Sequence, residues 1–341
     1  MNAAIKGTGA GACAAAAVLL ASGWKISLLR SCQQELLMVP WVTVNGETTA
    51  LLYALFGTSL QLPVKRWIAG RAVRRGRTRP PTLVRSASAL IPLSEFNIAL
   101  LTFLKQLYGA RLEILDEVED NGPPHIAAAQ HGSGYVLSTG TRLAWHSEVE
   151  LAVPLDHAVF EVVPQGWMYL APGGAGIGHL ICVAIAGSDE QVHAMIEDSI
   201  EIADCVAGVN CILPPLPAAA EFCWPVDCAE VLRCGAGIFR WDPMCGDGMG
   251  ASLRSGILAA AGLESISAGE SSLAVRAHLV RRCAVAFSAH AAACEVFYRS
   301  FELNSSWDAE ISTVERARVT INQAVPDAKW EFRLQNCKLV R

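Results

Sequence analysis

Two glycine-rich segments have the residue types and spacings that suit binding of a phosphate-bearing ligand. The first, Gly7-Thr8-Gly9-Ala10-Gly11-Ala12, has the pattern Gly-x-Gly-x-x-Ala close to the N-terminus. In such a turn the first glycine permits a tight bend and the second lets backbone amides approach a pyrophosphate. The small third residue keeps the following helix close to the strand. Gly7, Gly9 and Ala12 therefore predict a dinucleotide-binding turn; the alternative is an Ala/Gly-rich packing helix.

The second segment runs from Arg233 to Ser255. A short apolar strand ends there in a glycine turn, and Asp242-Pro243 and the glycines Gly246, Gly248 and Gly250 then lead into a helix. Backbone amides exposed at a helix N-terminus can hold an anionic ring edge. We expect this segment to contact the same ligand as the first.

The elements around the first turn form a predicted β-α-β unit, with strands at 3–5 and 24–29 and a small-residue helix at 13–22. A ribose-binding acid is expected at the end of the second strand, but the residue there is Arg30. An arginine at this place suits the 2′-phosphate of NADP. It can also pair with a nearby carboxylate or point into solvent.

The rest of the chain alternates between helical and β patterns. Residues 135–187 have short apolar runs broken by prolines and glycines, which predicts strands, and Gly173–Gly178 within them predicts a hairpin loop. Further elements are predicted as a strand at 111–115, a strand at 229–234, and helices at 94–107, 190–205, 251–261, 275–301 and 307–324. This order indicates a nucleotide-binding fold interrupted by a β-rich second domain.

Composition excludes several classes of protein. Of 341 residues, 52% are hydrophobic and 17% are charged, which excludes a disordered or collagen-like chain, and the net charge of −5 argues against a nucleic-acid partner. Residues 7–24 are uncharged but mostly Ala and Gly, so we expect no transmembrane helix; a secretory signal remains the alternative. The 12 cysteines form no C-x2-C pair, so we predict no metal site and expect free thiols in a reducing compartment, the cytoplasm.

Charge is unevenly distributed along the sequence. No acidic residue occurs from Thr48 to Ser94, and the basic residues of this window are Lys65, Arg66, Arg71, Arg74, Arg75, Arg77, Arg79 and Arg85. Prolines and a glycine mark residues 74–81 as a loop. The window is either a solvated surface or a docking site for an acidic partner or a phosphate-bearing cofactor.

The segment from Arg233 to Ser255 resembles the flavin-contacting motif of FAD-dependent aromatic monooxygenases and flavin-dependent halogenases. Its core, Asp-Pro-Met-Cys-Gly-Asp-Gly at 242–248, most resembles the flavoproteins that modify tryptophan in partner polypeptides during tryptophylquinone maturation. Further motifs of that branch have counterparts in the same order along the chain, at Val44–Thr48, Leu137–Gly140, Gly166–Pro172, His290–Cys294, Phe297-Tyr298 and Trp307–Glu310.

The resemblance implies an α/β fold: a Rossmann-like FAD-binding domain of the p-hydroxybenzoate hydroxylase type, interrupted by a β-sheet substrate domain and followed by C-terminal helices. The expected domains are 1–145 and 227–272 for the two parts of the FAD-binding domain, with some strands shared. Residues 146–226 would form the substrate domain and residues 273–341 the helical segment.

The resemblance also implies FAD as the cofactor and assigns roles to residues. Gly7, Gly9 and Ala12 would hold the pyrophosphate. The other cofactor-binding residues would be Arg30, Gly235, Asp242, Pro243, Gly246 and Gly248. The catalytic candidates are Glu47, Trp167 and Tyr169. Two residues depart from the family pattern: Ala236 replaces an Asp at the ribityl chain, and Arg30 replaces the ribose-binding acid.

These features predict a flavin-dependent monooxygenase-like enzyme that acts on an indole or related aromatic group within a peptide or protein. A separate flavin reductase is a possible second partner, and an acidic substrate segment would dock on Arg74, Arg75, Arg77 and Arg79. Two alternatives stay open. A degenerate flavoprotein would bind a partner without chemistry, and an NADP-dependent reductase would use Arg30.

Overall fold

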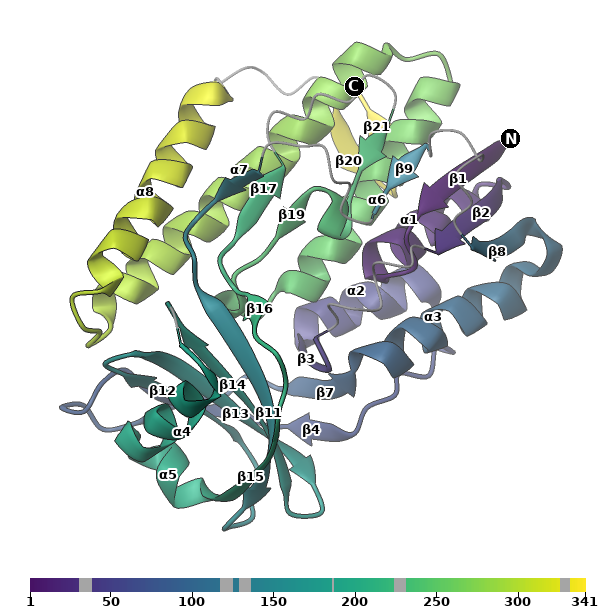
Figure 1. Ribbon diagram of the computed structural model, residues 1–341. Helices are drawn as coiled ribbons and strands as arrows, with labels where there is room; N and C mark the ends of the chain where they lie inside the picture. The colour runs from purple at the N-terminus through teal and green to yellow at the C-terminus, as the bar shows by residue number, and fades with distance from the viewer. Residues whose placement is uncertain (31–38, 117–124, 129–135, 186, 224–230, 326–331) are drawn as a thin grey trace.

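The computed structural model describes residues 1–30, 39–116, 125–128, 136–185, 187–223, 231–325 and 332–341. Two parts of the molecule lie one above the other in Figure 1. The upper part holds a parallel sheet and the longest helices, and the lower part holds a large, mostly antiparallel sheet. Among the helices in the described ranges, none combines the length and the apolar character needed to span a bilayer.

Five parallel strands form the sheet of the upper part, in the order β18-β9-β1-β2-β8. Their bounds are β1 (Asn2–Lys6), β2 (Lys25–Arg30), β8 (Leu112–Asp116), β9 (Ile126–Ala127) and β18 (Leu232–Arg233). Helix α1 (Ala10–Ala21) connects β1 to β2, which confirms the predicted β-α-β unit. Helices α3 (Leu93–Tyr108) and α6 (Gly248–Ser267) pack against α1.

Helix α1 is buried nearly all round. Residues 10–20 of this helix are all buried, as expected for a core helix that is apolar on every face. Small residues let α6 lie very close to it. A Cβ atom at Gly256 would overlap the carbonyl oxygen of Gly11, so this crossing requires glycine.

The large sheet of the lower part has the strand order β15-β11-β14-β13-β12-β5-β6, with β16 paired to β11. Its strands are β5 (Arg71–Arg74), β6 (Thr82–Val84), β11 (Leu143–Leu151), β12 (Ala158–Val163), β13 (Gly166–Gly174), β14 (Ile177–Ala184), β15 (Val206–Ile212) and β16 (Leu216–Pro217). The turn between β13 and β14 confirms the predicted glycine hairpin.

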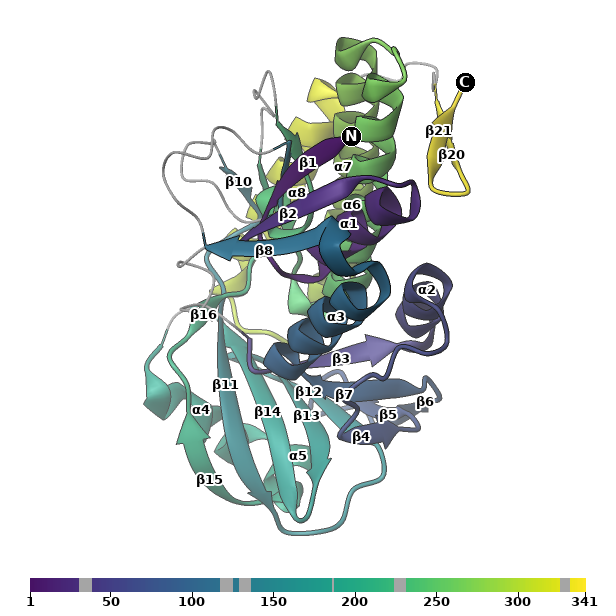
Figure 2. The ribbon, with the colours of Figure 1, turned by 90° about the vertical axis from the view of Figure 1, so that its right-hand side faces the viewer.

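Alternate residues of the large sheet face two different helical layers. Trp145 and Met168 pack against α4 (Asp189–Asp198) and α5 (Glu201–Cys205). On the opposite face, Trp167 packs against α7 (Ser272–Ser300) and α8 (Trp307–Ala324). Figure 2 shows α4 and α5 beside the large sheet.

Smaller elements complete the described chain. A second antiparallel sheet has the order β3-β7-β4, a third has the order β10-β17-β19, and β20 pairs with β21 in a hairpin. Their bounds, with those of the remaining helices, are β3 (Trp41–Asn45), α2 (Gly46–Phe56), β4 (Arg66–Ile68), β7 (Ser88–Pro92), η2 (Gly109–Arg111), β10 (Val136–Ser138), β17 (Glu221–Cys223), η3 (Gly235–Gly237), β19 (Phe239–Arg240), η4 (Pro243–Cys245), β20 (Arg333–Gln335) and β21 (Lys338–Val340).

The predicted domain ranges stay predictions. The large sheet takes β5 and β6 from the first predicted range, and the 145/146 boundary falls inside β11. The 226/227 boundary lies outside the described residues.

The prediction of one helix at 190–205 is wrong, because the chain forms α4 and α5 with a break between them. The cause is the buried carboxylate of Glu161 on β12. It accepts hydrogen bonds from the backbone N–H groups of Ile200 at 2.7 Å, Glu201 at 2.9 Å and Ile202 at 3.0 Å. These bonds satisfy a new helix N-terminus and so start α5.

Two helix starts also differ from the prediction. Helix α6 begins at Gly248, three residues before the predicted start. Helix α3 begins at Leu93 with Pro92 as its N-cap residue, one residue before the predicted start.

Candidate functional site

The first glycine turn lies between the end of β1 and the start of α1. Gly7 has a φ of 113°, and its N–H donates to the Leu29 carbonyl at 2.8 Å. Gly9 is the N-cap residue of α1, so the amides at the N-terminus of that helix point out of the turn. Ala12 is fully buried against the core. This is the strand-turn-helix geometry that the Gly-x-Gly-x-x-Ala spacing predicts.

The second glycine segment lies directly against the first. A Cβ atom at Gly11 would lie 3.1 Å from the Cα atom of Gly235, so a side chain there would fit only if the two segments moved slightly apart. Gly235 has a φ of 51°, and its N–H donates to Ser255 Oγ at 2.9 Å. Two segments separated by more than 200 residues thus form one continuous backbone surface.

A cavity of about 980 Å³ begins at this surface and extends into the lower part of the molecule. One end is lined by Thr8 to Gly11 and by Arg30, and the middle by Ala236 and the 242–249 loop. Side chains from the large sheet line the other end, among them Phe160, Trp167 and Tyr169. The cavity therefore connects the glycine turn to an aromatic wall.

Most of the predicted site residues line this one cavity. They are Gly9, Arg30, Trp167, Tyr169, Gly235, Asp242, Pro243, Gly246 and Gly248. Gly7 and Ala12 do not line the cavity. Gly7 has the positive φ of the tight turn, and Ala12 is buried on the core side of α1.

Glu47 lies outside the cavity lining. Its side chain is exposed in the first turn of α2, where Asn45 is the N-cap and accepts the Thr48 N–H at 2.8 Å. The neighbour that lines the cavity is Asn45. Glu47 therefore does not line the cavity that Trp167 and Tyr169 line, and its predicted catalytic role stays a prediction.

Asp242 is the acidic residue of the cavity lining in the described part of the chain, and its carboxylate is fully engaged. It accepts hydrogen bonds from Arg142 at 3.0 Å, from the Tyr298 hydroxyl at 2.8 Å and from the Met244 N–H at 3.0 Å. Asp242 is only 1% exposed. Its role in the structure is to anchor the 242–249 loop.

Arg142 links this loop to the C-terminal helices. Its guanidinium donates to Glu310 of α8 at 2.6 Å, and Glu310 also accepts the Thr141 N–H at 2.8 Å. Burial lowers the pKa of Arg142, but the groups of Tyr298, Asp242 and Glu310 raise it more, so the net pKa lies above the usual value. Arg142 therefore stays charged within the protein.

Sequence reasoning missed Arg142, although its surroundings carried a signal. Gly140 and Glu310 both belong to the motifs quoted for the family resemblance. In the structure a Cβ atom at Gly140 would overlap the Glu310 carboxylate. The two motifs thus meet at a buried basic residue that neither of them contains.

The aromatic wall is held in place from behind. Trp167 stacks on Phe160 with 5.5 Å between the ring centroids, and its indole N–H donates to the Tyr298 hydroxyl at 3.4 Å. Burial raises the pKa of Tyr298 well above its usual value, and burial also raises the pKa of Tyr169. Both phenols are therefore neutral hydrogen-bonding groups at physiological pH.

His146 adds a neutral imidazole to the cavity lining. Burial lowers the pKa of His146 to about 4. Since an imidazole with so low a pKa is uncharged near neutral pH, it contributes no positive charge to the cavity.

Arg30 lies at the glycine-turn end of the cavity. Its guanidinium is 4.0 Å from the Asp116 carboxylate, and both side chains are largely exposed. Such an exposed pair contributes little stability, so Arg30 can turn toward a ligand at low cost.

The basic window is partly neutralised within the chain. Arg74 pairs with Glu201 at 2.6 Å and Arg77 with Asp198 at 3.5 Å. The prediction of a loop is wrong for Arg74, which ends β5 and is largely buried, whereas Arg75 to Pro81 connect β5 to β6 as predicted. The acids come from α4 and α5, so their pairing with the window could not be read from local sequence.

No profile of a known protein family and no curated protein matches the sequence. Solved structures do match. The myxobacterial chondrochloren halogenase CndH, a variant of FAD-dependent halogenases, aligns with a TM-score of 0.75 and 14% identity over 95% of this chain and 90% of its own. The flavin-dependent halogenase CmlS aligns with a TM-score of 0.70 and 14% identity over 94% of this chain and 72% of its own.

A third similar structure is the peptidyl tryptophan dihydroxylase QhpG, which is essential for tryptophylquinone biogenesis. It aligns with a TM-score of 0.71 and 17% identity over 99% of this chain and 85% of its own. The structural matches confirm the resemblance drawn from the motifs. The chain has the α/β fold of FAD-dependent halogenases and hydroxylases.

Proposed function

We propose that this protein is an FAD-dependent monooxygenase-like oxidoreductase that acts on an indole or related aromatic side chain within a peptide or protein. The observation that carries the proposal is the single cavity that joins the glycine turn, the 242–249 loop and the aromatic wall. A dinucleotide cofactor and an aromatic substrate need such a connected space, because the reacting ring must meet the substrate away from water.

The residues of the cavity fit FAD. The N-terminus of α1 offers backbone amides and a positive dipole end to a pyrophosphate. The side chains of Arg30 and Arg71 add positive charge to the lining, whereas Arg240, which also lines the cavity, is paired with Glu221 at 3.1 Å. The glycines at 11 and 235 leave a flat backbone surface between the two segments. The halogenase PltM, another similar structure, was solved with phloroglucinol and FAD.

FAD, when bound, supplies the redox chemistry with molecular oxygen. The chain itself would bind and orient. Gly246 and Gly248 would lie against the isoalloxazine, on the loop that Asp242 anchors. Trp167 and Tyr169 would position the substrate ring, and the apolar lining around Phe160 would exclude water. Because the Asp242 carboxylate is already engaged, we assign it no proton transfer.

The choice of a polypeptide substrate is supported by the likeness to QhpG, whose name describes action on peptidyl tryptophan. Reducing equivalents would come from a separate flavin reductase. The competing activity is halogenation, which the similarity to CndH and CmlS favours.

A degenerate flavoprotein that only binds a partner is the second candidate, favoured by Ala236 and Arg30 at positions where carboxylates are expected.

Mass spectrometry of a tryptophan-containing peptide, incubated with the reduced holoprotein and oxygen, distinguishes the three candidate functions. Gain of one or two oxygen atoms supports the proposal. Gain of a halogen in halide buffer supports a halogenase, and an unchanged peptide supports the partner-binding role.

Cofactor identity is tested by thermal stability. FAD should stabilise the folded protein by RT ln(1 + [L]/Kd) and so raise its melting temperature, whereas NADPH should leave the melting temperature unchanged. A shift with NADPH alone contradicts the proposal and supports the reductase alternative.

A matched pair of glycine variants locates the binding site. Gly248 and Gly46 are the first residues of α6 and α2, and a Cβ atom at either position meets no close protein atom. Gly248→Leu places a side chain in the cavity and should abolish the FAD-dependent shift. Gly46→Leu lies outside the cavity lining and should keep the shift. If FAD raised the melting temperature of both variants equally, FAD would bind at a site other than this cavity.

A further inference from the structure

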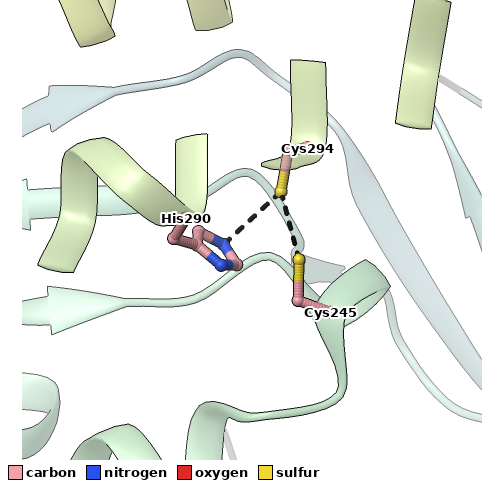
Figure 3. Close-up of side chains that lie close together, drawn as sticks. All are labelled: Cys245, His290 and Cys294. Atoms are coloured by element: carbon pink, nitrogen blue, oxygen red, sulfur yellow. Dashed lines mark hydrogen bonds between the residues drawn. The ribbon is translucent and has the colours of Figure 1, made fainter. Parts of the chain in front are cut away.

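Three buried or half-buried side chains with soft-metal donor atoms meet behind the 242–249 loop. Cys245 ends η4, while His290 and Cys294 lie one turn apart on α7, and Figure 3 shows all three pointing toward one another. The two Sγ atoms are 3.8 Å apart, and Cys294 Sγ is 3.6 Å from His290 Nε2. The donor atoms of the three residues all lie within 4.8 Å of one another.

We propose that Cys245, His290 and Cys294 form a binding site for a soft divalent cation, with Zn²⁺ as the expected ion. Tetrahedral zinc has Zn–S distances of about 2.3 Å and Zn–N distances of about 2.0–2.1 Å, which place two sulfurs about 3.8 Å apart and a sulfur and a nitrogen about 3.6 Å apart. Two of the three distances between the donor atoms, Sγ–Sγ and Cys294 Sγ to His290 Nε2, already have these values. The third distance, between Cys245 Sγ and the His290 nitrogen, is within 4.8 Å, and binding would bring these two atoms to about 3.6 Å.

The histidine presents a lone pair to the cluster. His290 Nε2 accepts the backbone N–H of Asp242 at 3.0 Å, so this nitrogen carries no proton in that arrangement. Coordination would exchange this hydrogen bond for a metal–nitrogen bond. Trp241 packs edge-on against the ring, with centroids 4.1 Å apart, and limits the orientations of the imidazole.

A bound dication would leave the charge balance of the buried residues unchanged. Among the described residues, the buried network next to the cluster contains the carboxylates of Asp242 and Glu310 and the guanidinium of Arg142. A dication held by two thiolates and a neutral imidazole adds no net charge to these buried residues. This arrangement avoids the large cost of burying an unpaired charge.

The site would keep one coordination position open. His290 and Cys294 are buried, whereas Cys245 is half-buried and lines the large cavity. Three protein ligands with a fourth position open to solvent or substrate are typical of catalytic zinc sites, and four protein ligands are typical of structural ones. The proposed ion would therefore be reachable from the space in which the substrate binds.

Cobalt titration of the full-length protein tests this site. The probe is Co²⁺ added to reduced, metal-free and flavin-free protein, so the result does not depend on the proposed oxidoreductase activity. We expect one Co²⁺ per chain, intense visible bands of a tetrahedral ion and a near-ultraviolet thiolate-to-cobalt band. Added Zn²⁺ should displace the cobalt and remove these bands.

Three variants make the test specific. Cys245→Ser should weaken Co²⁺ binding by at least ~100-fold, more than the loss of an outer hydrogen-bonding partner. His290→Gln keeps an acceptor for the Asp242 N–H and should also lose binding while it melts near the wild-type temperature. Cys211→Ser removes an exposed thiol outside the cluster and should bind Co²⁺ like the wild type.

Three results would overturn the proposal. The first is that reduced wild-type protein gives no tetrahedral cobalt spectrum. The second is that Cys245→Ser keeps full affinity. The third is that peptide mapping after alkylation finds a Cys245–Cys294 disulfide that re-forms in the presence of Zn²⁺, which would identify a redox pair.

Discussion

At the scale of single residues, Ala236 is the informative departure from the family pattern. Its side chain is exposed and lines the cavity next to Gly235, so a larger residue can be placed there without displacing the core. The ribityl chain of a bound flavin carries hydroxyl groups, and these can donate hydrogen bonds to a carboxylate.

Ala236→Asp should tighten FAD binding by about tenfold through one charge-assisted hydrogen bond. Fluorescence quenching of the flavin measures the dissociation constant. Ala236→Leu, which adds similar bulk without an acceptor, is the control and should not tighten binding. Unchanged affinity in the aspartate variant would show that another group already serves the ribityl chain.

Because of His146, we expect the free energy of unfolding to fall at acidic pH. The pKa of this imidazole is lowered to about 4 by burial, so the unfolded chain binds the proton more tightly than the folded one. Stability should therefore fall as the pH drops from about 6.5 toward about 4, by an amount on the order of 3 kcal/mol from this residue alone.

The difference between wild type and His146→Leu isolates this contribution, because other groups titrate in both proteins. Urea unfolding at several pH values should show a shallower acid limb for His146→Leu. The control His193→Leu removes an exposed histidine of α4 and should leave the limb unchanged. If the free energy of unfolding depended on pH in the same way in wild type and His146→Leu, the conclusion that His146 is buried and neutral would be contradicted.

At the scale of elements, Arg142 holds the 242–249 loop and α8 to β11. Removing it leaves Asp242 and Glu310 buried without their cationic partner. Arg142→Met should therefore destabilise the protein by about 3–5 kcal/mol in urea unfolding.

Arg318→Met provides the comparison for Arg142→Met. Arg318 is partly exposed on α8 and pairs with Glu295 at 3.2 Å, so its removal should cost less than about 1 kcal/mol. A small loss for Arg142→Met would mean that the two carboxylates rearrange or take up protons without penalty.

The sequence was sufficient for elements that local patterns define. The β1-α1-β2 unit follows from glycine spacing and apolar runs, and the β13–β14 hairpin from its glycine cluster. Sequence was insufficient where a distant charge decides the local structure. Glu161 starts α5 from another element, and Glu201 pairs with Arg74 from 127 residues away.

The candidate site also has features that local sequence defines and features that only tertiary contacts decide. That Gly9 and Gly248 lie at helix starts facing the cavity was predictable, because these positions depend on local backbone geometry. Side-chain roles were not. Glu47 lies away from the cavity because Asn45 caps α2, and Cys245 reaches Cys294 through tertiary packing that no C-x2-C spacing reveals.

At the scale of the whole molecule, the β5–β6 part of the basic window lies at the edge of the large sheet. Arg74 and Arg77 are paired within the chain, while Arg75 and Arg79 make no ion pair among the described residues. If this surface steers an acidic polypeptide, the unpaired arginines should carry the effect, mainly through the association rate.

Arg75→Ser/Arg79→Ser should slow association of a synthetic peptide that has one tryptophan flanked by aspartates, and should reduce the salt dependence of that rate. Stopped-flow measurements at two salt concentrations provide the test. Arg316→Ser/Arg333→Ser removes the same charge from other exposed positions and should have less effect. Equal rates in both variants would mean that the window is a solvated surface.

The contact between Gly11 and Gly256 has a consequence for synthesis of the protein. Helix α1 is complete by residue 21, yet the helix that covers it begins at residue 248, and the edge strand β18 begins at residue 232 of 341. Until the ribosome has made that later segment, the face of α1 that contacts α6 has no cover, although α3 can already pack against another part of the helix. Such exposed apolar surface is prone to aggregation. We therefore expect the newly made N-terminal segment to need protection from aggregation during translation.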